Sequence, residues 1–151
     1  MEYELVKLQE KKAAGLRART NNFSPDMGMV IGGLWQRFYQ EDIYGQIPGK
    51  VTGKALGVYS GYAGDEKADY DISVACEIDG TGDMPQDVTL FTIPEGNYAK
   101  FIVKGNVQTA VSEFWQELWK MDLERTFVCD FEEYQDSEMD EAEIHLYIGV
   151  K

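Results

Sequence analysis

The sequence predicts an α+β fold in which two β-α-β-β units stand side by side and share an antiparallel sheet. Two segments of helical pattern carry nearly the same motif, LWQRFY at residues 34–39 and FWQELW at residues 114–119. Strand-like sequence precedes each helix, and two further strand-like runs follow it. A repeat of this kind predicts one domain over residues 1–151, with repeats at about 1–79 and 87–151. The seam between the repeats is a natural position for a ligand cleft.

The first repeat opens with extended segments at residues 3–9 and 11–19, which lead through a loop into the first helix. Ser24 is a suitable N-cap residue, with Pro25 in the first turn. Apolar residues at helical spacing form one stripe: Ile31, Leu34, Trp35 and Phe38. The glycine pair at residues 32–33 lowers helix propensity, so either another element packs closely there or the helix is weaker.

Two strands complete the first repeat. Residues 43–53 carry a proline and several glycines, which predicts a loop before them. The strands are expected at residues 54–62 and 70–78, as a hairpin around the turn at residues 63–67. The segment 79–87, with its acidic residues, glycines and proline, is the expected junction between the repeats.

The second repeat follows the same order. Strand-like runs at residues 88–93 and 98–104 precede the helix that carries the second copy of the motif. Two closing strands are expected at residues 127–134 and 143–150, separated by the acidic loop 135–141.

Alternation along the strands predicts which side chains share a face of the sheet. In the last strand the even-numbered apolar residues are expected under the second helix, with Tyr147 on the other side. In the strand before it, Phe131 is expected under the helix. The face away from the helices then gathers Tyr59, Glu132, Tyr134 and Tyr147. Aromatic rings around one carboxylate suit a planar or cationic organic molecule.

The charge balance limits the classes of partner. The chain has 27 acidic and 14 basic residues, for a formal net charge of −13. Such a surface repels phosphate backbones, so direct nucleic-acid binding is not expected. It would favour cationic ligands or a basic protein partner, although acidic surfaces commonly serve solubility alone.

The cysteine, histidine and glycine patterns do not predict a metal or cofactor site. Cys76 and Cys129 lie in strand-like runs and are expected as buried, reduced thiols. His145 is the only histidine, so no metal site is expected, and phosphate-binding glycine motifs are absent. With no signal peptide and no apolar run long enough for a membrane span, a cytoplasmic protein without a cofactor is expected.

Several side chains have two interpretations. Trp35 and Trp115 lie on apolar stripes and are expected in the core, whereas Trp119 lies off its stripe and fits either core or cleft. Glu132 lies in an acidic run, which is more typical of a solvated face than of a buried site. The roles of Tyr62, Tyr70 and Tyr98 depend on a strand register that alternation does not fix.

Five short motifs occur along the chain: AGL at 14–16, LWQRF at 34–38, LGVY at 56–59, IPEGNYAKF at 93–101 and DFEEY at 130–134. With these motifs the chain resembles the GyrI-like small-molecule-binding family, also seen as the effector-binding domain of multidrug-responsive transcription activators. The resemblance extends from Tyr3 to Val150. Each motif is short, but their order and spacing together are specific. No helix-turn-helix precedes the opening strand, so a stand-alone member is expected.

The resemblance implies two β-α-β-β units of the SHS2 type with a ligand cleft between them. In the family, the glutamate of a Phe-Glu-x-Tyr motif is a buried acidic residue of the cleft, and it corresponds to Glu132. A tyrosine of the last strand also lines family pockets, and it corresponds to Tyr147.

These observations support one leading function and two alternatives. The leading one is capture of hydrophobic, planar or cationic compounds, with Glu132 as the charge and Tyr59, Trp119, Tyr134 and Tyr147 as aromatic walls. The resemblance also allows a hydrolase that detoxifies cyclopropane-containing DNA alkylators, in which Glu132 assists water attack and Tyr147 or Tyr134 stabilises developing charge. A protein that protects gyrase through a protein interface is the second alternative.

Overall fold

The computed structural model describes residues 2–65, 67–136 and 138–151. Its elements, in chain order, are β1 Glu4–Leu8, β2 Lys11–Thr20, α1 Met27–Gln40, α2 Ile43–Gln46, β3 Lys50–Ser60, β4 Tyr70–Ile78, β5 Thr89–Ile93, β6 Gly96–Gly105, α3 Val107–Leu118, β7 Arg125–Tyr134 and β8 Ala142–Val150. Glu66, in the expected turn between β3 and β4, and Ser137, in the acidic loop, lie outside the described residues. Within that part of the chain, no helix is long and apolar enough to cross a membrane.

The strands form one antiparallel sheet in the order β1-β6-β8-β7-β3-β4-β2-β5. The second repeat contributes β6, β8 and β7, and the first contributes β3, β4 and β2, so the two halves run in mirrored order. They meet where β7 pairs with β3, over six facing residue pairs from Ala55↔Tyr134 to Ser60↔Cys129. The predicted α+β fold of two β-α-β-β units is confirmed.

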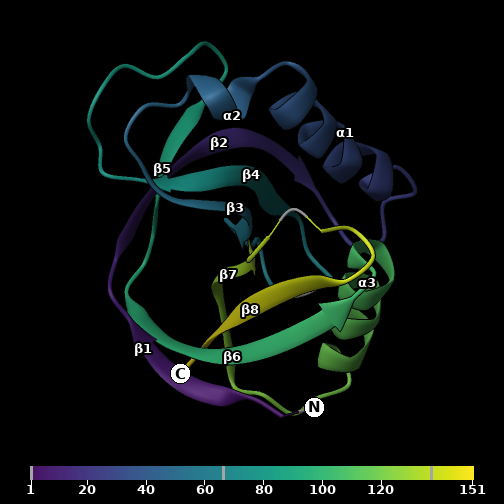
Figure 1. Cartoon of the computed structure of the whole chain (residues 1–151). Helices are drawn as coiled ribbons and strands as arrows, with labels where there is room; N and C mark the ends of the chain where they lie inside the picture. The colour runs from purple at the N-terminus through teal and green to yellow at the C-terminus, as the bar shows by residue number, and fades with distance from the viewer. Residues whose placement is uncertain (1, 66, 137) are drawn as a thin grey trace.

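The repeats exchange their first strands. β1 pairs with β6 of the second repeat, and β5 pairs with β2 of the first. Leu8 faces Gly96 and Lys11 faces Ile93, so one register runs unbroken from the β1–β6 ladder into the β2–β5 ladder. The continuous segment β1–β2 therefore lies antiparallel to the continuous segment β5–β6. These two segments form one bent ribbon, which draws the two edges of the sheet together and curls it into a half-barrel (Figure 1).

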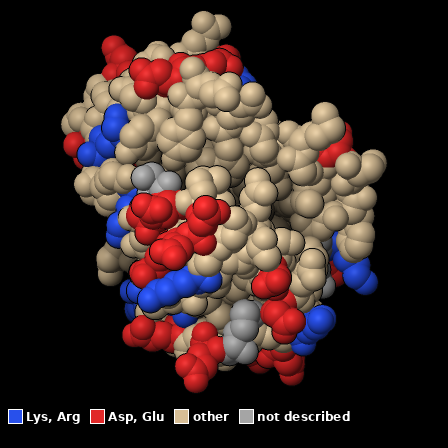
Figure 2. Space-filling model, turned by 45° about the vertical axis from the view of Figure 1, so that its right-hand side comes forward, with Lys and Arg blue, Asp and Glu red and all other residues tan. Residues whose placement is uncertain are grey.

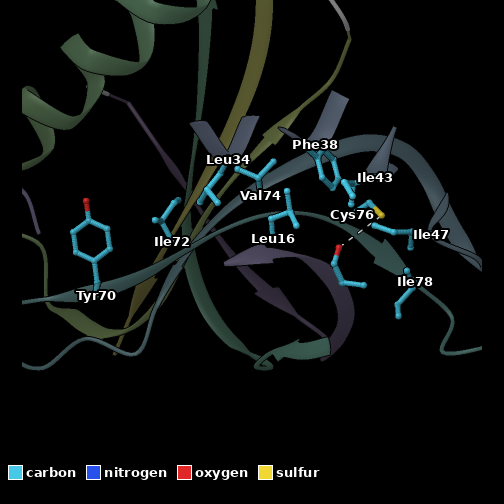
Figure 3. Packing of buried hydrophobic residues seen from close by; sticks show 11 residues of the cluster. Leu16, Leu34, Phe38, Ile43, Ile47, Tyr70, Ile72, Val74, Cys76 and Ile78 are labelled. Carbon is cyan, nitrogen blue, oxygen red and sulfur yellow. Dashed lines mark hydrogen bonds between the residues drawn. The ribbon is translucent and has the colours of Figure 1, made fainter. Parts of the chain in front are cut away.

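The sheet is covered on both faces. α1 and α3 lie on the same side of the curl (Figure 1). α1 packs on a cluster with Leu16, Val74 and Cys76, shown in Figure 3 with Tyr70 at one end of the row. α3 packs on the even-numbered residues of β8, as alternation predicts. A third cluster contains residues from both repeats and from both segments of this ribbon, and it fills the inside of the curl.

Two local predictions differ from the structure. α1 begins at Met27 with Asp26 at the cap position and not at Ser24, because the Ser24 carbonyl accepts a hydrogen bond from Met27 N in a turn before the helix (3.2 Å). The predicted loop 43–53 contains α2 and the start of β3. A four-residue helix is too short to show a period, and Lys50 is held in the sheet by pairing with Ile78.

Gly15 and Gly33 differ in the space around them. A Cβ on Gly15 would lie 2.0 Å from the Val74 carbonyl oxygen and 2.5 Å from Ala75 Cα, because β2 and β4 approach closely there. A Cβ on Gly33 would meet nothing within 4 Å. The helix α1 therefore forms despite its glycine pair, and no close packing explains Gly33.

We expect the same substitution to act in opposite directions at these two sites. Gly33→Ala should raise the free energy of unfolding by about 0.5–1 kcal/mol, because alanine costs less backbone entropy in a helix. Gly15→Ala should lower it by about 1–3 kcal/mol or more, because the clash is with backbone atoms. Urea denaturation of both variants and the wild type measures the two effects. A destabilised Gly33→Ala variant would contradict the open surroundings of that residue.

Candidate functional site

A cavity of about 950 Å³ lies between α1 and α3, over the strands where the two repeats meet. Aromatic side chains from both repeats line it, together with aliphatic and polar residues: Trp35, Tyr39, Tyr59, Tyr62, Tyr70, Trp115, Trp119 and Tyr134. Figure 2 is turned toward the side that carries α1 and α3 and shows a recess in the surface, with acidic side chains prominent around it. A cavity of this size is ample for a small organic molecule.

Glu132 lines the cavity, on the strand β7 at the seam, and is 2% exposed. Its carboxylate accepts three hydrogen bonds. Tyr59 Oη donates to Oε2 at 2.9 Å, Trp115 Nε1 donates to Oε2 at 2.8 Å, and Tyr134 Oη donates to Oε1 at 2.7 Å. Both oxygens are therefore held in fixed positions by neutral donors from both repeats.

Gly57 makes room for this carboxylate. It faces Glu132 directly across the β3–β7 ladder. A Cβ on Gly57 would lie 2.7 Å from Glu132 Oε1. The absence of a side chain on one residue of the facing pair thus allows the carboxylate of the other to lie over the seam.

Burial dominates the electrostatics of Glu132. It raises the pKa of the carboxyl above its ordinary value of 4.5, and the three donors oppose this only in part. No basic side chain of the described residues forms an ion pair with Glu132. Burial, and then the charge of Glu132, also raise the pKa of Tyr59 and of Tyr134 well above 10.0. Both hydroxyls therefore stay protonated near neutral pH and remain donors.

The aromatic walls are braced across the seam. Trp35, on α1, meets Tyr134 of the other repeat edge to face with ring centroids 5.0 Å apart. Trp115, on α3, meets Tyr59 of the other repeat in the same way, also at 5.0 Å. Such pairs favour fixed ring orientations. Each helix is thus tied to a strand of the opposite repeat, and the cavity walls are formed before any ligand arrives.

Four residues predicted for the cleft line this cavity: Tyr59, Trp119, Glu132 and Tyr134. Their role in binding stays a prediction. The face of the sheet that carries the cleft was predicted wrongly. The cavity lies on the face that the helices cover, whereas Phe131, which was expected under a helix, packs inside the curl. The inner face of a curled sheet has its own apolar core, so apolar side chains in β7 do not mark the face that a helix covers.

Tyr147, also expected in the cleft, lies on the opposite face. It packs in the cluster inside the curl, 9% exposed, with its ring stacked on Phe131 at a centroid distance of 4.6 Å. The sheet separates it from the Glu132 carboxylate. The two residues therefore cannot act together on one bound molecule.

Other cavity residues were not predicted. Trp35 and Trp115, expected in the core, line the cavity, and so do Tyr62 and Tyr70. The available signal was the repeat itself, because equivalent tryptophans on two helices that flank a seam can both face it. Tyr98 lies elsewhere, in the cluster inside the curl, with its hydroxyl donating to the Pro94 carbonyl at 2.7 Å.

A metal centre has no support in the described part of the chain. No group of three or more His, Cys, Asp or Glu side chains there could hold a metal ion. His145 instead lies beside Glu143, with 2.8 Å between Nε2 and a carboxylate oxygen. The chemistry of the site rests on the buried carboxylate, its donors and the aromatic walls.

Solved structures of the same fold are known. An integron cassette protein from the mobile metagenome of Vibrio cholerae is 21% identical, with a TM-score of 0.81 over 99% of this chain and 95% of that chain. SAV2435 bound to tetraphenylphosphonium is 24% identical, with a TM-score of 0.78 over 100% and 94%. A putative bacterial transcription regulation protein from Staphylococcus aureus MU50 is 22% identical, with a TM-score of 0.75 over 100% and 99%.

The family is shown by a direct match to its model. No curated protein matches the chain, but the model of Cass2, described as integron-associated effector binding protein, matches residues 4–150. The predicted resemblance to GyrI-like small-molecule-binding domains is thereby confirmed. The chain belongs to the family of integron-associated effector-binding proteins.

Proposed function

We propose that this effector-binding protein captures lipophilic, aromatic monocations in the cavity between α1 and α3. The observation that carries the proposal is Glu132, a fully buried carboxylate that has neutral donors but no cationic partner among the described residues. A buried charge without a counter-charge is costly, by several kcal/mol before compensation. A bound cation supplies the missing counter-charge, so part of the cost of burying Glu132 is recovered on binding.

The walls suit the same class of ligand. Aromatic rings attract a cation through their faces, by about 2 kcal/mol when the contact is desolvated. They also bury the apolar part of a ligand, at roughly 25 cal/mol per Å². Asp136 and Glu138 line the cavity as well and add negative charge to its rim. Charge and aromatic area thus favour a cation whose charge is spread within an apolar body.

Tetraphenylphosphonium is a suitable probe for this proposal. It combines one positive charge with four aromatic rings, and it is the compound bound to SAV2435, which shares the fold. It has no titratable group and no hydrogen-bond donor, so its binding reports charge and aromatic contact alone.

Hydrolysis of a strained ring has no comparable support. Both oxygens of Glu132 are occupied by the hydroxyls of Tyr59 and Tyr134 and by the indole of Trp115. Tyr147, the second residue of that hypothesis, lies across the sheet. Three of the roughly four acceptor positions of the carboxylate are therefore taken by fixed donors, and the residue expected to stabilise developing charge lies on the other face of the sheet.

Glu132→Gln should weaken tetraphenylphosphonium binding by about tenfold or more, because two opposite unit charges about 6 Å apart attract by roughly 3 kcal/mol at an effective dielectric constant of about 20. Glutamine keeps the shape of the side chain and removes the charge. Its amide oxygen can still accept from Trp115 and Tyr59, and its amide nitrogen can donate to the Tyr134 hydroxyl, which is able to accept as well as donate. The affinity for the neutral analogue triphenylphosphine oxide should differ little between the wild type and the variant. Isothermal titration calorimetry with both compounds measures the difference.

Glu133→Gln is the matched control, since Glu133 is the next residue of β7 and contacts Lys54 and Gln135 instead of the cavity. We expect it to bind tetraphenylphosphonium as the wild type does. Equal losses in both variants, or equal losses for the cation and the neutral analogue, would refute Glu132 as the counter-charge.

Affinity for tetraphenylphosphonium should fall as the pH drops through the raised pKa of Glu132, because the protonated carboxyl no longer attracts the cation. Above that pKa the affinity should be constant. The contribution of Glu132 to the free energy of unfolding of the ligand-free protein should instead increase as the pH drops. A carboxyl whose pKa is raised in the folded state favours folding when protonated, and this contribution is lost as the pH rises through the folded pKa.

Equilibrium dialysis from about pH 8 down to about pH 5 tests the pH dependence. The Glu132→Gln variant serves as the reference and should give a flat profile over the same range. If the variant shows the same fall in affinity as the wild type, another group is responsible.

A further inference from the structure

The two helical walls of the cavity use equivalent positions of the two repeats. The repeated motif aligns residue 34 with residue 114. On this alignment, each cavity-lining residue of α1 has a counterpart on α3 that also lines the cavity. Those residues of α1 are Met27, Gly28, Ile31, Gly32, Trp35 and Tyr39. Differences between the two walls therefore show where the cavity departs from the symmetry of its scaffold.

The walls differ most at two of these positions, where α1 has no side chain. Gly28 and Gly32 of α1 correspond to Gln108 and Ser112 of α3. Both glycines are exposed. Apart from chain neighbours and the backbone of α1, a Cβ on either glycine would have no atom of the described residues within 4 Å. α1 therefore leaves open space where α3 carries side chains, and we call this space beside Gly28 and Gly32 the α1 hollow.

Helical periodicity directs the α1 hollow into the cavity. At about 100° per residue, Gly28 and Gly32 fall within an arc of about 60° that also holds Trp35 and Tyr39. The rings of Trp35 and Tyr39 line the cavity and stack on each other, with centroids 6.2 Å apart. Because side chains on a helix lean toward its N-terminus, a side chain at residue 32 would extend over residue 28. Gly33 lies about 100° farther around the helix, outside this arc.

Helix stability does not explain glycine at these two positions. Alanine is more favourable than glycine in a helix, because it loses less backbone entropy on folding. The open surroundings of Gly28 and Gly32 would admit its methyl group. Glycine instead provides volume, in a cavity whose 950 Å³ or so lies near the upper end of the usual range for ligand pockets.

We propose that Gly28 and Gly32 determine the size selectivity of the cavity, because the α1 hollow takes one bulky aromatic arm of the bound cation. The proposal rests on the proposed function, since it assumes a cation beside Glu132, and it adds the shape of the ligand. The preferred class is an onium ion whose charge is surrounded by aromatic rings in three dimensions. A smaller or flatter cation would leave the α1 hollow empty.

Two phosphonium ions test the proposal: tetraphenylphosphonium and methyltriphenylphosphonium. They carry the same charge and differ by one phenyl group in place of a methyl group. The wild type should bind tetraphenylphosphonium about tenfold more tightly, because its fourth ring buries additional apolar area in the hollow. Gly32→Leu should reduce this ratio to about threefold or less, because the leucine side chain fills the hollow. Titration calorimetry measures the affinities, and their ratio is the readout.

Gly33→Leu is the matched control, since it adds the same side chain to the next residue of α1, outside the arc that lines the cavity. It should keep the wild-type ratio. Gly28→Leu should lower the ratio as Gly32→Leu does. Urea denaturation should show that Gly32→Leu is at least as stable as the wild type, because leucine favours a helix more than glycine does. A lower ratio then reports the shape of the cavity and not unfolding.

A neutral pair of ligands separates this proposal from the proposed function. Triphenylphosphine oxide and methyldiphenylphosphine oxide also differ by one phenyl group in place of a methyl group, and NMR titration measures their weaker binding. Their ratio of affinities should fall in Gly32→Leu as well.

The possible outcomes are distinct. A wild type that does not distinguish the members of either pair, or ratios that persist in Gly32→Leu, would overturn the role of the α1 hollow and leave the proposed function intact. If the ratios fall but tetraphenylphosphonium binds no more tightly than triphenylphosphine oxide, the proposed function fails and the hollow stands. If none of the four compounds binds the wild type, both proposals fail.

Discussion

The site depends on one facing pair, Gly57 and Glu132, at the seam between the repeats. The strand order is mirrored about this seam, and each member of the pair is followed two residues later by a tyrosine that donates to the carboxylate, Tyr59 or Tyr134. The two positions are thus equivalent in a duplicated unit. Only one of them can carry a side chain, because a Cβ on Gly57 would meet the carboxylate. A symmetric scaffold therefore presents a single charge at its centre.

The strand exchange explains why this charge can be held so firmly. Because β1 and β5 each pair with the opposite repeat, neither half can move without disturbing a ladder of the other. The cluster inside the curl adds apolar contacts from both repeats beneath the cavity floor. Fixed donors solvate a charge without reorganising. The three fixed donors therefore oppose, without cancelling, the rise in the pKa of Glu132 that burial causes.

Local pattern was sufficient for the elements and for part of the site. The repeated helical motif correctly predicted α1 and α3, and alternation in β8 correctly predicted the surface beneath α3. Tyr59, Glu132 and Tyr134 also meet, as predicted. The failure at Tyr147 has a physical origin. Both faces of β7 and β8 are buried, so alternation shows two faces but does not say which of them a helix covers. The strand exchange is long-range pairing, which no local pattern encodes.

Selectivity should arise from the cavity and not from the overall charge of −13. Charges on the surface are screened within about 8 Å at physiological salt, so they concentrate cations near the protein without distinguishing one from another. Glu132, the proposed counter-charge, lies in the protein interior, where screening by salt is weak. On the proposed function, one buried carboxylate distinguishes ligands by their charge at short range, which a surface field cannot do.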